Sequence, residues 1–184
     1  MNAPVDVINV RIETDRLILR AWQENDLADF YKYASVPGVG EKAGWSHHQS
    51  MEESARILGH FIDGKKTFAL ELKENYKVIG SLGLEPRADN AGLSDELQGR
   101  EIGYVLSKDY WSRGLMPEAV KAVIAYCFDE LNFDYLTCGH FDHNDRSRRV
   151  VEKCGFTFLF DRVQTIPSGR TEEIRTYIRC NPNK

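Results

Sequence analysis

The chain has 184 residues, of which 42% are hydrophobic and 28% are charged, a composition typical of a globular protein and not of a disordered one. Its formal net charge of −4 argues against a general nucleic-acid-binding protein, which needs a basic face. No apolar run approaches the roughly 20 residues of a membrane-spanning helix. The length fits a single domain, which we expect over residues 1–184. The first residues do not resemble a secretion signal, so we expect the protein to be located in the cytoplasm.

The first half of the chain predicts one strand, two helices and then three strands. Alternating residues 16–21 predict the first strand. The first helix is expected to begin at Asn25 or Asp26. The second is expected to begin after Ser50, with Glu53 completing the pattern of a capping box. Strands are then predicted at residues 68–73, 78–85 and 100–106, the first two as an antiparallel hairpin.

The second half predicts two helices and three strands. Pro117 suits the first position of a helix, and apolar residues recur after it at helical spacing. A strand follows at residues 135–141, and Asn144 or its neighbour begins a short helix that ends at Gly155. The last two strands are predicted at residues 156–163 and 173–180. This order of elements indicates a mixed sheet with helices on its faces.

Cysteine and histidine spacing gives no sign of a metal site. The four cysteines have no CxxC spacing, and neither they nor the five histidines form a ligand pattern. Without a secretion signal, we expect all four to be reduced thiols in the core. They are Cys127, Cys138, Cys154 and Cys180.

One segment carries the strongest sign of ligand binding. The predicted strand 100–106, the turn 111–116 and the helix after it form a strand–turn–helix unit. The first N–H groups of a helix lack internal partners, and the helix dipole adds partial positive charge, so such a turn can bind an anion. Gly114 lets the backbone approach a phosphate and Arg113 adds charge. An ordinary turn without a ligand fits this spacing equally well.

Four ordered segments resemble the RimJ/RimL group of the GNAT acetyltransferase superfamily. The segment WSRGLMPEAVKAVIAYCFDELN resembles the loop and helix that bind the acetyl-CoA pyrophosphate. TDRLILR, REIGYVL and NDRSRRVVEKCGF resemble the opening strand, the central strand and the second cofactor segment. The match covers residues 14–160. It implies an α/β (α+β) fold, with a mixed, mostly antiparallel central sheet that is flanked by helices and splayed between two parallel strands.

The resemblance also implies a set of cofactor contacts. The pantetheine arm of acetyl-CoA would lie between strands 102–106 and 135–141, and an N–H near Val105 would bond the thioester carbonyl. Trp111, Met116 and Pro117 depart from the general superfamily loop, so pyrophosphate binding would rest on backbone groups. The implied cofactor-binding residues are Tyr104, Val105, Leu106, Arg113, Gly114, Leu115, Met116, Asn144 and Arg149.

Two residues are the candidates for catalysis. The amine attacks directly in such enzymes, and it must first be neutral, because an α-amine has a pKa of about 7.7–8.0 and a lysine of about 10.4. Glu101 is the candidate base, directly or through a water. A solvated carboxylate at a strand end is the alternative. Ser147 matches the serine near the coenzyme sulfur, although it could simply sit in a helix first turn capped by Asn144, and Tyr104 is an alternative acid.

These features favour an N-acetyltransferase for a peptide or protein N-terminal α-amine. The alternative acceptor is a small amine such as a polyamine, an amino acid or an aminoglycoside, which often needs an acidic pocket; Asp89, Asp95 and Glu96 hint at one. A non-catalytic acetyl-CoA sensor ranks third. The early loop with Trp45, His47 and His48 lies where the group forms its acceptor pocket. The sheet edges and the final strand offer surfaces for a homodimer.

Overall fold

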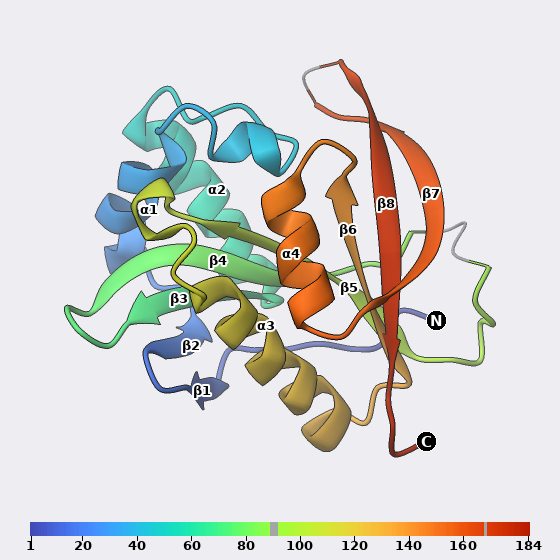
Figure 1. The fold of residues 1–184 in the computed structure, drawn as a ribbon. Coiled ribbons are helices and arrows are strands. Elements are labelled where there is room, and N and C mark those ends of the chain that lie inside the picture. The colour runs from blue at the N-terminus through green and yellow to red at the C-terminus, as the bar shows by residue number, and fades with distance from the viewer. Residues whose placement is uncertain (89–91, 168) are drawn as a thin grey trace.

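The computed structural model describes residues 1–88, 92–167 and 169–184. An eight-stranded sheet forms its centre, and helices cover both faces (Figure 1). The strands are β1 (Arg11–Glu13), β2 (Leu17–Ala21), β3 (Thr67–Leu72), β4 (Lys77–Glu85), β5 (Gly99–Leu106), β6 (Tyr135–Phe141), β7 (Thr157–Thr165) and β8 (Thr171–Cys180). The α-helices are α1 (Leu27–Ala34), α2 (Met51–Gly64), α3 (Leu115–Ala125) and α4 (Asp145–Lys153), and α3 continues into a π-helical turn at Tyr126–Glu130.

The strand order explains where the sheet opens. The order is β1-β2-β3-β4-β5-β6-β8-β7, and within the described residues β5 and β6 are the only neighbouring strands that run parallel. Their pairing covers only residues 99–102 of β5 and 135–138 of β6. Beyond that point each strand continues without the other, so the sheet splays between them. The predicted mixed, mostly antiparallel sheet with a splay between two parallel strands is therefore confirmed.

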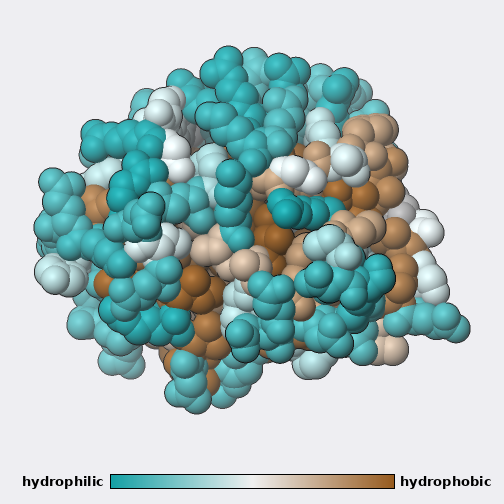
Figure 2. Space-filling view, turned by 60° about the horizontal axis from the view of Figure 1, so that its bottom comes forward, coloured by the Kyte–Doolittle hydropathy of each residue, from teal (hydrophilic) through white to brown (hydrophobic). Residues whose placement is uncertain are grey.

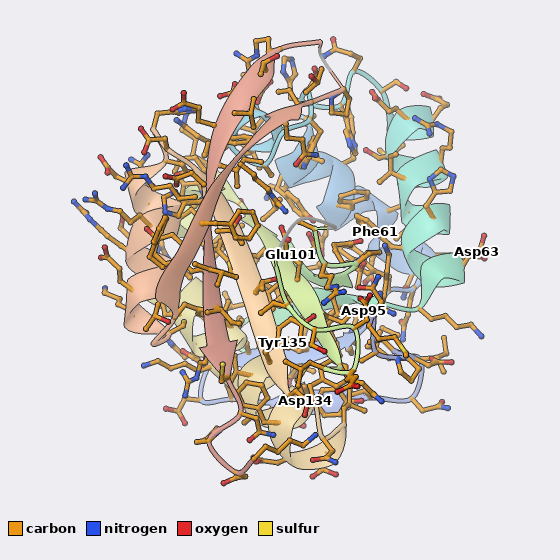
Figure 3. The ribbon with its side chains drawn as sticks, turned by 90° about the vertical axis from the view of Figure 1, so that its right-hand side faces the viewer. Phe61, Asp63, Asp95, Glu101, Asp134 and Tyr135 are labelled. Atoms are coloured by element: carbon orange, nitrogen blue, oxygen red, sulfur yellow. The ribbon has the colours of Figure 1, made fainter. Side chains whose placement is uncertain are left out.

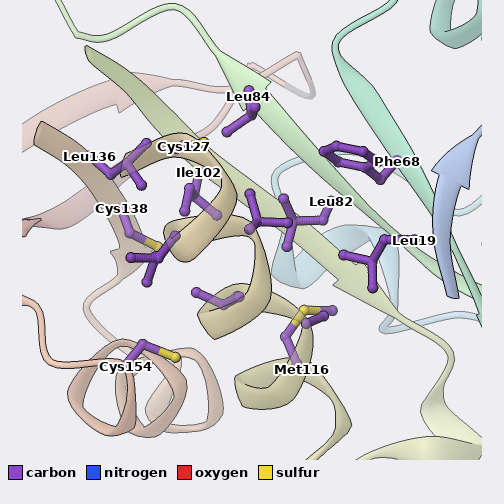
Figure 4. Packing of buried hydrophobic residues seen from close by; sticks show 14 of the residues in the cluster. Leu19, Phe68, Leu82, Leu84, Ile102, Met116, Cys127, Leu136, Cys138 and Cys154 are labelled. Carbon is purple, nitrogen blue, oxygen red and sulfur yellow. The ribbon is translucent and has the colours of Figure 1, made fainter. Parts of the chain in front are cut away.

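Alternate residues of the strands pack against helices on opposite faces of the sheet. Phe68 and Leu70 of β3 join the larger core cluster with α3 and α4, part of which is seen in Figure 4. Ala69, between them, joins the cluster under α1 and α2. Because both faces are covered, β3 is buried at every position, and its sequence reads as an almost continuous apolar run.

Three details differ from the expectations. The third helix begins at Leu115, so Pro117 is its third residue; proline is tolerated there because the N–H groups of a first helical turn need no internal partner. Cys180 is exposed, whereas the other three cysteines are buried, because it ends its strand. The final strand lies inside the sheet between β6 and β7, so the sheet edges are β1 and β7.

The face of the molecule in Figure 2 is mostly polar. Figure 2 shows hydrophilic residues over most of one face, with hydrophobic residues gathered in smaller patches between them. None of the helices in the described ranges combines the length and the apolar composition needed to cross a bilayer.

A glycine in β4 allows the close approach of β5, and its substitution should destabilise the protein. A Cβ added at Gly80 would lie 2.4 Å from the carbonyl oxygen of Val105, a backbone atom that cannot rotate away. We expect Gly80→Ala to lower the free energy of unfolding by about 2 kcal/mol. Gly59→Ala is the matched control, because a Cβ there would meet nothing within 4 Å and alanine favours a helix by roughly 0.5–1 kcal/mol. Urea denaturation of both variants tests the expectation, and a neutral Gly80→Ala would contradict it.

Candidate active site

A cavity of about 680 Å³ opens where β5 and β6 diverge. Its walls come from strands β5 and β6, the first turn of α3, helix α4, the loop before α2 and the β7–β8 hairpin. Two helix N-termini and the edges of two separated strands thus face one space. That arrangement suits a long ligand with an anionic end.

The turn before α3 has a backbone shaped for anions. Ser112 and Gly114 both have positive φ values, 63° and 76°. Alternation of left-handed and right-handed residues turns successive N–H groups toward a common point, forming an anion-binding nest. Leu115 and Met116 follow in the first helical turn, with buried side chains, so only their backbone can face a ligand. The first helical bond runs from the N–H of Glu118 to the carbonyl of Gly114 (3.2 Å).

Basic side chains of α4 surround the same end of the cavity. Arg146, Arg149 and Lys153 line it, and the Arg146 guanidinium lies over the Trp111 ring, 4.8 Å from the ring centre. Arg148 instead pairs with Asp145 and Glu152 along the helix. The Arg113 side chain is exposed over the Tyr110 ring. The predicted cofactor residue Arg149 therefore lies at the cavity, whereas Arg113 is not among the described residues that line it.

The backbone of β5 alternates between β4 and the gap toward β6. The N–H of Ser107 donates to the carbonyl of Ile79 in β4. Val105 precedes Ser107 by two residues and lies opposite Ser81, so its N–H also faces β4. The backbone of Leu106 faces away from β4, and its carbonyl accepts a hydrogen bond from the Trp111 indole (2.8 Å). The N–H groups of Leu106 and Tyr104 therefore face the gap. The donor expected near Val105 is best assigned to one of these two neighbours.

Glu101 lines the cavity and is paired with an arginine from β7. Figure 3 shows Glu101 on β5, in the interior of the molecule. The Arg162 guanidinium donates to both of its carboxylate oxygens, from Nη2 at 2.6 Å and from Nη1 at 3.1 Å. The two side chains are only 15% and 13% exposed. Gly139 of β6 leaves room beside the pair, because a Cβ there would lie 3.4 Å from Arg162 and 3.6 Å from Glu101.

Ser147 forms a polar cluster with Asn144 and Tyr104. Asn144 caps α4, its Oδ1 accepting from the N–H of Ser147 (3.3 Å), while its Nδ2 donates to the carbonyl of Lys42 (3.2 Å). The hydroxyls of Ser147 and Tyr104 are 2.8 Å apart, and both residues line the cavity. Burial raises the pKa of Tyr104 well above its usual value, so its hydroxyl stays protonated at neutral pH.

One part of the cavity wall is apolar. Phe141, Ile166 and Ile174 form a small buried cluster that lines the cavity together with Trp45. The Glu85 carboxylate, also at the cavity, pairs with Lys66. A wall of this kind suits an acceptor with an uncharged side chain.

Several residues of the early loop and of the acidic loop lie elsewhere. The His47 and His48 rings bond to Glu41 and Ser54, both at 2.7 Å, and His48 is buried. Asp95 pairs with Arg87, and neither Asp95 nor Glu96 is among the described residues that line the cavity. Asp89 lies outside the described residues. Within those residues, no group of three His, Cys, Asp or Glu side chains could hold a metal ion.

Sequence reasoning missed two groups at the site. Arg162 bonds Glu101 across 61 positions of sequence, and Lys153 reaches the cavity from the last residue of α4. The basic residues that precede Lys153 in the sequence could have indicated that Lys153 also reaches the site. No local pattern could have found the first.

The donor set fits acetyl-CoA. A nest at a helix N-terminus and three basic side chains suit its phosphates, and the unpaired edges of two strands suit the amides of its pantetheine arm. Tyr104, Ser147 and Glu101 line the same cavity.

Comparison with known proteins agrees with this geometry. A family model described as an acetyltransferase (GNAT) domain matches residues 16–157. YoaA, an uncharacterised N-acetyltransferase of Bacillus subtilis strain 168, is 26% identical over 150 residues, which cover 79% of this chain and 81% of YoaA.

Solved structures share the fold. A GNAT-family acetyltransferase of Bacillus anthracis superimposes with a TM-score of 0.81 at 21% identity, covering 94% of this chain and 99% of the other. RimL, a ribosomal L7/L12 α-N-protein acetyltransferase, has a TM-score of 0.72 at 16% identity, covering 92% and 93%. The chain therefore belongs to the GNAT acetyltransferase family, and it is an N-acetyltransferase that depends on acetyl-CoA.

Proposed function

We propose that the acceptor is the α-amine at the N-terminus of a peptide or protein, acetylated in the cytoplasm. The observation that supports this choice is the charge state of the cavity: among the described residues that line it, the carboxylates are Glu101 and Glu85, and each is paired with a cation of the chain itself. A polyamine or an aminoglycoside carries several positive charges and needs unpaired carboxylates to bind. A peptide N-terminus carries one amine, and its side chain can meet the apolar wall.

RimL gives a second line of support. That protein is described as acting on the α-amine of a ribosomal protein, and it shares the fold over most of both chains. Its identity to this chain is only 16%, so the similarity supports a shared fold but does not by itself identify the substrate. The cavity charges therefore remain the main argument for a peptide acceptor.

The proposed reaction is a direct transfer within a ternary complex, with the acetyl group supplied by the thioester of acetyl-CoA. Glu101 would accept the proton of the attacking amine, directly or through a water. An N–H of Leu106 or Tyr104 would hold the carbonyl oxygen as it gains negative charge. The Ser147 hydroxyl would donate a proton or a hydrogen bond to the departing sulfur.

An acceptor panel tests the proposal. The protein is incubated with acetyl-CoA and with N-terminal peptides, polyamines, aminoglycosides or free amino acids, and product is read by mass. Mass is preferred to a thiol dye because the exposed Cys180 would react with the dye. We expect acetylation of peptides at their α-amine. Turnover of small amines alone would refute the proposal, and acetyl-CoA binding without any product would favour a sensor.

A further inference from the structure

The turn between β1 and β2 contacts the first turn of α3, although some 100 residues separate them. The Glu118 carboxylate accepts from the Thr14 hydroxyl (2.6 Å), from the N–H of Arg16 (2.9 Å) and from Nε of Arg16 (2.8 Å). Nη2 of Arg16 lies 2.6 Å from the same carboxylate. Burial raises the pKa of Glu118, but these hydrogen bonds outweigh it and lower the pKa, so the carboxylate is ionised at neutral pH.

Arg16 makes a further contact with the anion-binding turn itself. Its Nη1 donates to the carbonyl oxygen of Arg113 at 2.9 Å. The C=O and N–H of a trans peptide unit point in opposite directions because the unit is planar. Fixing the Arg113 carbonyl toward Arg16 therefore directs the N–H of Gly114 away from Arg16. Gly114 lines the cavity, and Arg16 is not among the described residues that do.

We propose that Arg16 is a positioning residue for the pyrophosphate of acetyl-CoA, which it does not touch. Through the Arg113 carbonyl it holds the left-handed turn at Ser112 and Gly114 with its N–H groups facing the cavity. A non-glycine residue with positive φ costs free energy unless its surroundings fix it. Arg16 supplies that restraint, so the turn is ordered before the cofactor arrives and less freedom is lost on binding.

Arg16 also neutralises a charge that would oppose the phosphates. Glu118 is the fourth residue of α3, and its carboxylate lies beside the helix end that faces the cavity. Unpaired, it would repel an anion and weaken the attraction of the helix N-terminus. The ion pair with Arg16 removes this repulsion while Glu118 anchors the arginine. Orientation of the turn and neutralisation of Glu118 are separable by experiment.

Binding of two thioesters tests the role in the turn. Acetyl-CoA carries the pyrophosphate, and S-acetylpantetheine does not. Binding is followed by tryptophan fluorescence, because Trp45 and Trp111 line the cavity. We expect Arg16→Ala to weaken acetyl-CoA binding by about tenfold, the effect of losing one charge-assisted hydrogen bond. The dissociation constant of S-acetylpantetheine should change by less than about twofold.

The second ligand separates a positioning role from general damage. A loosened fold would weaken both ligands alike, so an equal loss for the two would overturn the proposal, as would no loss for either. Arg11→Ala is the matched control, because Arg11 pairs with Glu13 on the neighbouring strand β1 and both are about half exposed. It should bind both thioesters as the unchanged protein does.

A double variant separates orientation from charge. Arg16→Ala combined with Glu118→Gln removes both members of the ion pair and leaves the Arg113 carbonyl without its donor. If orientation matters, acetyl-CoA binding should remain clearly weaker than in the unchanged protein. Full recovery would show that Arg16 only neutralises Glu118, and the positioning role would be refuted.

Discussion

Replacing Glu101 by Gln is expected to lower kcat/KM for a peptide α-amine by about a hundredfold or more at pH 7. Most of an amine with a pKa of about 7.7–8.0 is protonated at that pH and must lose a proton before it attacks. Glutamine is nearly isosteric but cannot accept that proton. Its amide oxygen can still accept one of the two hydrogen bonds from Arg162, whereas its NH2 group cannot accept the other. Acetyl-CoA binding, measured separately, should be unchanged.

The pH dependence of this loss distinguishes a base from a structural carboxylate. As the pH rises above about 8, most of an α-amine is neutral in solution, so the base is no longer needed to deprotonate it before the attack, and only the proton released after the attack remains to be accepted. The ratio of the unchanged protein to Glu101→Gln in kcat/KM should therefore fall toward one between pH 7 and pH 9. A loss of equal size at every pH would contradict a role as base.

Glu85→Gln is the matched control for Glu101→Gln. Glu85 also lines the cavity and also pairs with a basic side chain, Lys66. It lies opposite Glu101 in the β4–β5 pairing. We expect less than about a threefold change in kcat/KM at any pH, because no proton transfer depends on it. A loss in Glu85→Gln that equals the loss in Glu101→Gln would show that the cavity merely needs negative charge.

Local signals predicted the elements whose ends are set by local chemistry. Ser50 caps α2 by accepting from the N–H of Glu53 (3.2 Å), as its pattern indicated, although the Glu53 carboxylate reaches back to Gln49 and not to Ser50. Gly155 ends the last helix with φ of 74°. Its N–H donates to Glu152, and the N–H of Phe156 donates to Val151, the bonds of a Schellman cap. Each of these contacts spans six residues or fewer.

Features that depend on residues distant in the chain could not be predicted from the sequence. β1 has only three residues and no pattern of its own, and it forms because Ile12 lies opposite Leu19 of β2. The start of α3 was placed two residues late, since proline is acceptable at both its first and its third position. The cofactor motifs are contiguous in the sequence, so they could be predicted from it. The ion pair of Glu101 with Arg162 joins distant residues, so it could not.

Ser147→Ala is expected to lower kcat by roughly a hundredfold while leaving acetyl-CoA binding nearly unchanged. Without a proton or a hydrogen bond from this serine, the sulfur would leave as a thiolate. Burial raises the pKa of Tyr104 well above the usual value, so its hydroxyl stays protonated and is able to donate a hydrogen bond. Its hydroxyl, 2.8 Å from that of Ser147, can hold the serine proton in place.

A double-mutant cycle tests whether these two hydroxyls act as one unit. Tyr104→Phe alone should lower kcat by about tenfold, and the Tyr104→Phe, Ser147→Ala double variant should be no slower than Ser147→Ala, because Tyr104 then has nothing left to orient. Tyr110→Phe removes another hydroxyl from the same cavity and serves as the control. If the two losses multiply, Tyr104 acts independently of Ser147, and if Ser147→Ala keeps its full kcat, the departing sulfur takes its proton from another donor.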